Sequence, residues 1–110
     1  METKVTKQKA AKTKPTARRV IVRTQSAGAF AGELISRVGQ EVMLGNARRL
    51  WYWQGASSLS ELATRGTSKP NGCKFPAPVS RVELLQAIEI LDVSPDAWAS
   101  IVAVPIWSAR

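Results

Sequence analysis

Residues 20–53 read VIVRTQSAGAFAGELISRVGQEVMLGNARRLWYW, and this stretch decides the fold class. Val20–Val22 is a run of β-branched residues, which is typical of a strand. We expect a second strand over Phe30–Val38, which a turn at Gly39-Gln40 joins to a third strand over Glu41–Trp53. The stretch therefore predicts two or three antiparallel strands that follow one another along the chain.

The dipeptide Gly45-Asn46 interrupts the third strand. Glycine and asparagine both tolerate a positive φ, so this point predicts a β-bulge or a sharp bend. A bulge adds one residue to the strand and reverses the face on which each later side chain lies. The residues alone therefore leave open the faces taken by Arg48 and Arg49.

A short helix is expected after the strands. Ser58 or Ser60 is suited to its N-cap, Glu61 follows Ser58 by three residues as in a capping box, and Gly66 is a good C-terminal residue. A proline-rich loop over residues 67–80 comes next. A loop of that length in so small a domain is often functional.

The last third of the chain predicts one long strand over Arg81–Val93 and then a second helix. Ser94-Pro95-Asp96 combines a capping serine, a proline in the first turn and an acidic residue near the positive end of the helix dipole. Residues 104–107 suit an edge strand, where proline is tolerated. The expected order is β-β-β-α-β-α-β: one α+β domain over residues 20–110, with a small antiparallel sheet and two short helices. The second helix is expected to bury Ala97, Trp98, Ile101 and Val102, and Trp107 is also assigned to the core.

Positive charge is concentrated at the N-terminus. The 110 residues carry 16 Lys and Arg against 8 Asp and Glu, a net charge of +8, and residues 1–19 alone carry +6. This segment is too poor in apolar side chains to offset its ordering entropy, so we expect a disordered basic tail. Both a solubilising extension and a weak, salt-sensitive contact with nucleic acid fit this composition. The basic residues of the tail are Lys4, Lys7, Lys9, Lys12, Lys14, Arg18 and Arg19.

Composition excludes several classes of function. The chain has no histidine and one cysteine, Cys73. Ser–His–Asp and Cys–His catalysis, a His-ligated metal site and an internal disulfide are therefore excluded. No apolar run approaches the roughly 18–20 residues that cross a bilayer. We expect a cytoplasmic protein that is not an enzyme and that uses neither a metal nor another cofactor.

Residues 46–56, NARRLWYWQGA, form the most informative segment. Two arginines lead into three consecutive aromatic residues. Arginine forks match phosphate oxygens, and aromatic rings stack on nucleobases. The pattern is typical of a site for a ligand that contains phosphate and a base, although aromatic core residues beside solvated arginines would give the same sequence. The candidate binding residues are Arg48, Arg49, Trp51 and Tyr52, together with Asn71, Lys74 and Phe75 from the long loop.

The block RRLWYWQGASSL, with the flanking runs VIVRTQSAGAFAGEL, KPNGCKFPAPV and IEILDVSPDAWASI, resembles a family of small uncharacterised phage and prophage proteins. The similarity covers roughly residues 20–107. This family in turn resembles the phage Thoeris anti-defence proteins, which sequester cyclic ADP-ribose isomers or cyclic oligonucleotides without cleaving them. The resemblance implies a signal-binding protein of the host cytoplasm, in which Arg48 or Arg49 holds phosphate and Trp51 or Tyr52 stacks on adenine. Asn71, Lys74 and Phe75 would then line the loop side of the site.

Two other classes of function remain alternatives. One is a nucleic-acid-binding accessory protein, in which the tail contacts phosphates and the aromatic block stacks on unpaired bases. The other is a structural or protein-interaction module of a phage. Because small domains often complete a pocket at a symmetric interface, we expect a homo-oligomer, with a dimer as the simplest form. We expect no association with a membrane.

Overall fold

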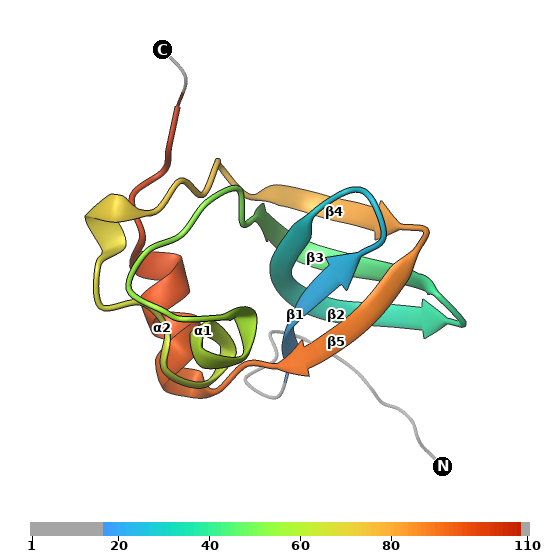
Figure 1. The fold of residues 1–110 in the computed structure, drawn as a ribbon. Helices are drawn as coiled ribbons and strands as arrows, with labels where there is room; N and C mark the ends of the chain where they lie inside the picture. The colour runs from blue at the N-terminus through green and yellow to red at the C-terminus, as the bar shows by residue number, and fades with distance from the viewer. Residues whose placement is uncertain (1–16, 109–110) are drawn as a thin grey trace.

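A computed structural model describes residues 17–108, which form a curled antiparallel sheet with two helices packed on its outer side (Figure 1). The fold is a small α+β fold of order β-β-β-α-β-β-α. The elements are β1 (Arg19–Thr24), β2 (Ala29–Val38), β3 (Glu41–Arg49), α1 (Leu59–Arg65), the 3-10 turn η1 (Pro70–Gly72), β4 (Val79–Leu84), β5 (Ala87–Asp92) and α2 (Pro95–Ala103).

The order of strands in the sheet is β4-β3-β2-β1-β5, and every neighbouring pair is antiparallel. β4 and β5 lie at opposite edges of this order, yet only Leu85 and Gln86 separate them along the chain. The sheet must therefore curl until its two edges meet at this turn, as Figure 1 shows. The prediction of a single strand over Arg81–Val93 is wrong. The turn at Leu85 and Gln86 divides this stretch into two strands: β4 pairs with β3, and β5 pairs with β1.

The buried apolar side chains form two clusters, one on each face of the curled sheet. The cluster inside the curled sheet, the interior cluster, draws on all five strands, whereas the helical-side cluster lies between β1, β2 and the helices. β1 is buried on both faces, because Val20 and Val22 belong to the first cluster and Ile21 to the second. The interior cluster contains Val20, Val22, Phe30, Val42, Leu44, Ala47, Leu84 and Ala87. The helical-side cluster contains Ile21, Ala29, Ala31, Leu50, Leu62, Ala63, Cys73, Phe75, Ile101 and Val104.

The predicted bulge in β3 is confirmed. Glu33 pairs with Gly45 and Ala31 pairs with Arg48, so two residues of β3, Asn46 and Ala47, lie opposite one residue of β2. Asn46 has a φ of 45°, the left-handed region that asparagine tolerates better than most residues. The extra residue moves Arg48 to the helical side of the sheet.

The predicted caps of α1 are confirmed. The Ser58 hydroxyl accepts a hydrogen bond from the Glu61 N–H at 3.2 Å, and the Glu61 carboxylate accepts one from the Ser57 N–H at 2.6 Å. Gly66 ends the helix with a φ of 77°. A Cβ at this glycine would collide with the Ser100 side chain, so both the backbone conformation and the packing require glycine.

α2 begins as expected, with Ser94 accepting a hydrogen bond from the Ala97 N–H at 3.0 Å. Ala97 and Ile101 are buried, but Val102 is 57% exposed, so its predicted burial is wrong. The predicted edge strand over residues 104–107 is also wrong. Only Ile106 makes an isolated bridge, to Phe75, because Pro105 has no N–H with which to continue a ladder.

Candidate functional site

Arg48 is buried at the centre of the helical side, with 6% of its surface exposed. Its guanidinium donates hydrogen bonds to five backbone carbonyls. The three shortest go to Phe75 at 2.6 Å, Val104 at 2.9 Å and Ile101 at 3.0 Å. Longer bonds go to the carbonyls of Pro76 at 3.1 Å and Pro105 at 3.4 Å.

These bonds give Arg48 a structural role. Residues 101–105 form the C-terminal end of α2 and the segment after it, where carbonyls lack helical partners and a cation is favourable. Burial lowers the pKa of Arg48 from its ordinary value, because desolvation disfavours the charge. The guanidinium thus ties the end of α2 and the segment around Phe75 to β3. All its donor atoms are engaged by carbonyls, so none is left to face a phosphate.

Arg49, the next residue, lies on the opposite side and is exposed. One of its terminal nitrogens donates to the Ala27 carbonyl at 2.7 Å, and its guanidinium lies over the Phe30 ring at 4.4 Å from the centroid. No acidic partner is found for it within residues 17–108. Of the two arginines, Arg49 is therefore the one that retains donors for a ligand.

Trp51 and Arg49 line an open hollow of about 440 Å³. Residues 26–28 of the loop between β1 and β2, together with Ala29 at the start of β2, form its other wall. Trp51 is 64% exposed, which is unusual for so large an apolar ring. The hollow therefore offers an aromatic face and a cation side by side.

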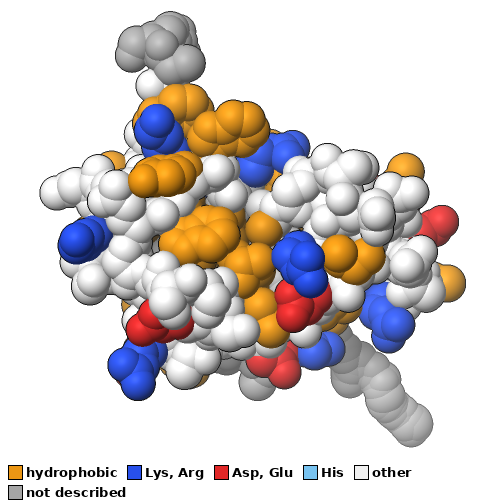
Figure 2. All heavy atoms as spheres, viewed as in Figure 1, with side chains coloured by type: hydrophobic (Ala, Val, Ile, Leu, Met, Phe, Trp, Pro, Cys, Tyr) orange, Lys and Arg blue, Asp and Glu red, His pale blue; other side chains and the backbone are white. Residues whose placement is uncertain are grey.

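Tyr52, Lys74 and Trp107 form a second group, which follows the first along the chain at Tyr52. Tyr52 and Lys74 exchange two backbone hydrogen bonds, of 3.3 and 2.7 Å. The Lys74 ammonium lies 5.7 Å from the centroids of both the Tyr52 and the Trp107 rings. We call Arg49, Trp51, Tyr52, Lys74 and Trp107 together the basic–aromatic surface. Figure 2 shows basic and hydrophobic side chains interspersed along the upper edge of the molecule, beside the C-terminal segment.

The other two loop candidates do not join this surface. Phe75 is fully buried in the helical-side cluster, where the Arg48 guanidinium lies 5.5 Å from its ring centroid. Asn71 is exposed in η1, and within residues 17–108 no hydrogen bond or ring contact joins it to the five surface residues. The sequence analysis assigned Trp107 to the core, because a lone tryptophan near the end of a small domain is more often a core residue. Only the tertiary structure places it at this surface, through the hydrogen bond from its backbone N–H to the Phe75 carbonyl at 3.0 Å.

Most of the predicted tail lies outside the described residues, namely Lys4, Lys7, Lys9, Lys12 and Lys14. Its last two members belong to the folded part. Arg18 pairs with Asp92 at 2.7 Å, and Arg19 pairs with Glu33 at 3.5 Å and lies over the Trp98 ring. Both charges are therefore already partnered by acidic side chains.

Within residues 17–108, no three Cys, Asp or Glu side chains gather into a group that would hold a metal ion. None of the helices in this range is long and apolar enough to cross a membrane.

A family model described as a domain of unknown function, DUF6948, matches residues 17–101. The chain belongs to this family. The match includes four members of the basic–aromatic surface and ends before the fifth, Trp107. Comparisons of this DUF6948 domain with curated proteins and with solved structures found no match.

Proposed function

We propose that this DUF6948 domain binds a nucleotide-derived ligand at the basic–aromatic surface and holds it without cleaving it. The observation that carries the proposal is the pairing of aromatic rings, of which Trp51 and Tyr52 are exposed, with cations that have no acidic partner in the described residues. Arg49 stands beside Trp51, and Lys74 stands beside Tyr52 and Trp107. Arginine and lysine bind phosphate oxygens, and exposed rings stack on bases at about 1–3 kcal/mol each.

The two groups favour a ligand with more than one recognition element. A cyclic dinucleotide carries two bases and two phosphates, and a cyclic ADP-ribose isomer carries an adenine and a pyrophosphate. The resemblance to phage sponge proteins makes these two classes the first to test. In that role the domain would withdraw an immune signal from the host by sequestration.

The test is a calorimetric titration of the full chain with both ligand classes, followed by recovery of the ligand from denatured protein. We expect one class to bind and to be recovered intact. Arg49→Ala and Lys74→Ala should each weaken binding about tenfold or more, because a hydrogen bond to a charged group contributes about 1.5–3 kcal/mol. The control is Arg37→Ala, which removes an exposed arginine near the turn between β2 and β3 and should bind as the parent does.

If Arg49→Ala and Lys74→Ala both bind with unchanged affinity, the basic–aromatic surface is not the binding site. If the ligand is recovered in a converted form, the protein is an enzyme and the proposal is wrong.

Single-stranded nucleic acid is the second candidate ligand, since exposed rings beside cations also bind unpaired bases. It predicts binding of short oligonucleotides with a steep salt dependence and no binding of cyclic ligands. Sedimentation of the same samples tests the expected dimer.

A further inference from the structure

β4 is the last strand at one edge of the sheet, and its backbone is bonded on one side only. Its ladder runs to β3, and within residues 17–108 no other segment forms a backbone hydrogen bond with it. β5 follows after Leu85 and Gln86, but Figure 1 shows it turning away from β4 after this turn. In the described part of the chain, one row of N–H and C=O groups along β4 therefore faces outward without a protein partner.

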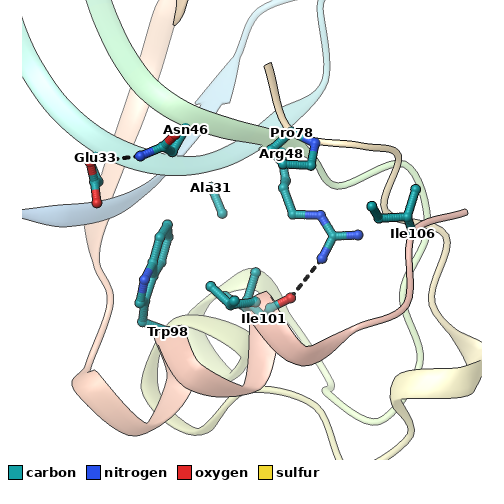
Figure 3. A pocket seen from close by; sticks show the side chains of 9 residues that line it. Ala31, Glu33, Asn46, Arg48, Pro78, Trp98, Ile101 and Ile106 are labelled. Carbon is teal, nitrogen blue, oxygen red and sulfur yellow. Dashed lines mark hydrogen bonds between the residues drawn. The ribbon is translucent and has the colours of Figure 1, made fainter. Parts of the chain in front are cut away.

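The helices that cover the other part of the sheet stop short of β4. A cavity of about 360 Å³ marks the boundary (Figure 3). Asn46 and Pro78 line it from the sheet side, and Trp98 and Ile101 line it from α2. Pro78 is the residue before β4, and four of the six residues of the strand are exposed: Val79, Ser80, Arg81 and Glu83. β4 therefore lies at the surface of the molecule.

The edge of β4 carries none of the usual protection against pairing with another strand. Proteins commonly protect an open edge with a proline, a bulge or lysine side chains. β4 reads VSRVEL, without proline or lysine, and its register with β3 runs without a shift. The opposite edge differs, because the β1–β5 ladder shifts register at Arg23 and Thr24 and the Ala87 N–H already donates to the Gln40 carbonyl at 2.9 Å. Of the two edges, β4 is therefore the one open to another strand.

Two opposite charges lie on the outer face of this edge. Leu84 is buried in the interior cluster and Val82 packs against it, so Arg81 and Glu83 point to the outer face. Within residues 17–108, neither of these two side chains has an ion-pair partner. The Arg81 guanidinium contacts the Met43 sulfur, which is only a weak acceptor. Both charges are therefore available to a neighbouring strand.

The pattern of these side chains is self-complementary in one register. If two copies of β4 pair antiparallel about a two-fold axis at Val82, Arg81 of each copy lies opposite Glu83 of the other. The same register places Val79, which is 49% exposed, opposite Leu85, which is 63% exposed. An axis at Arg81 or at Glu83 would instead place like charges opposite each other, which is destabilising. Any extended segment could bond to the open backbone, but a second copy also matches the charges.

We propose that the edge of β4 is a self-association surface, at which β4 of a second copy pairs antiparallel and joins the two sheets into one. A contact that is the same on both copies closes after two copies, so this edge gives the expected dimer a defined interface. The inference does not rest on the proposed ligand site, because no residue of the basic–aromatic surface lies in β4.

The test is sedimentation equilibrium of the full chain over a range of concentrations, with charge-reversal variants. We expect the parent to dimerise. Arg81→Glu and Glu83→Arg should each raise the dimer Kd about tenfold or more, because two attractive pairs become two repulsive ones. The matched controls are Arg37→Glu and Glu41→Arg, which make the same charge changes at exposed positions outside β4 and should dimerise as the parent does.

Two further samples test the register itself. The double variant Arg81→Glu/Glu83→Arg exchanges the two charges and should restore the dimer. An equal mixture of the two single variants should form a mixed dimer, because two carboxylates of one chain then lie opposite two guanidinium groups of the other. The proposal is overturned if the parent stays monomeric up to millimolar concentration, or if the single reversals dimerise as the parent does. It is also overturned if neither the double variant nor the mixture regains association.

Discussion

The inside of the curled sheet and the helical side differ in what holds them together. The interior cluster draws its side chains from strands, and the hydrogen-bonded ladders fix how those strands lie. The helical side combines two short helices with long segments, residues 50–58 and 66–78, that contain little regular structure. Backbone carbonyls in these segments have no strand ladder to satisfy them. One buried arginine, Arg48, supplies donors for five carbonyls of the helical side.

This difference shows how a small domain orders irregular segments. An unsatisfied buried carbonyl costs about 1–3 kcal/mol, so a side chain with several donors stabilises the helical side more than another apolar contact would. The interior of the sheet needs no such residue, because its polar groups are paired within the strands. The two regions should therefore respond differently to mutation.

Arg48→Met should have the largest effect. Methionine fills similar space but donates no hydrogen bond. The buried Val104 carbonyl then loses its Arg48 donor, whereas the carbonyls of Phe75 and Ile101 each keep one backbone bond, from the N–H groups of Trp107 and Val104. Because five hydrogen bonds from a charged group are lost together, we expect a loss of about 5 kcal/mol in the free energy of unfolding. Hydrogen exchange should show α2 losing protection while β1 and β2 keep theirs.

Arg48→Lys keeps the charge with fewer donors, and it should fall between the parent and Arg48→Met in urea unfolding. If both variants match the parent in stability, or if sheet and helices lose protection together, the assigned role of Arg48 is wrong.

Leu44→Ala and Leu62→Ala compare the two regions with the same chemical change. Both leucines are fully buried, Leu44 inside the sheet and Leu62 in α1. Each substitution should cost about 2–5 kcal/mol, and the cost depends on how far the surroundings can collapse into the cavity. Paired strands cannot move closer, whereas a seven-residue helix can. We expect Leu44→Ala to cost about 1 kcal/mol more than Leu62→Ala, and equal or reversed costs in urea unfolding would contradict this view of the helical side.

The smallest effect should be the pH dependence from Glu61. The hydrogen bond from the Ser57 N–H is the main cause that lowers the pKa of Glu61 below its ordinary value of 4.5. Because the folded-state pKa is depressed, this contribution is present above the unfolded-state pKa and is lost as pH falls through the folded-state value.

Unfolding measured across the acidic range should therefore show a loss of stability that is smaller in Glu61→Gln. Ser58→Ala serves as the control, because it removes the cap at a cost of about 1 kcal/mol without changing an ionisable group. A pH profile identical in Glu61→Gln and the parent would show that the capping carboxylate does not contribute.

Local signals predicted much of the fold. Strand-forming runs, the turn at Gly39-Gln40, the bulge at Gly45-Asn46 and the serine caps of both helices all depend on neighbouring residues. Two of the errors share one cause. The split of residues 81–93 into β4 and β5 and the exposure of Val102 depend on which distant segment lies opposite.

The candidate site shows the same division. The sequence by itself determined that cations and aromatic rings are adjacent in residues 48–53 and that a bulge precedes them. Only the tertiary structure decided which arginine is buried. One extra residue in β3 turns Arg48 toward the end of α2 and leaves Arg49 at the surface. It also decided that Trp107 stands beside Lys74, because residues so far apart in the chain meet only once the sheet has curled and α2 has returned the chain to it.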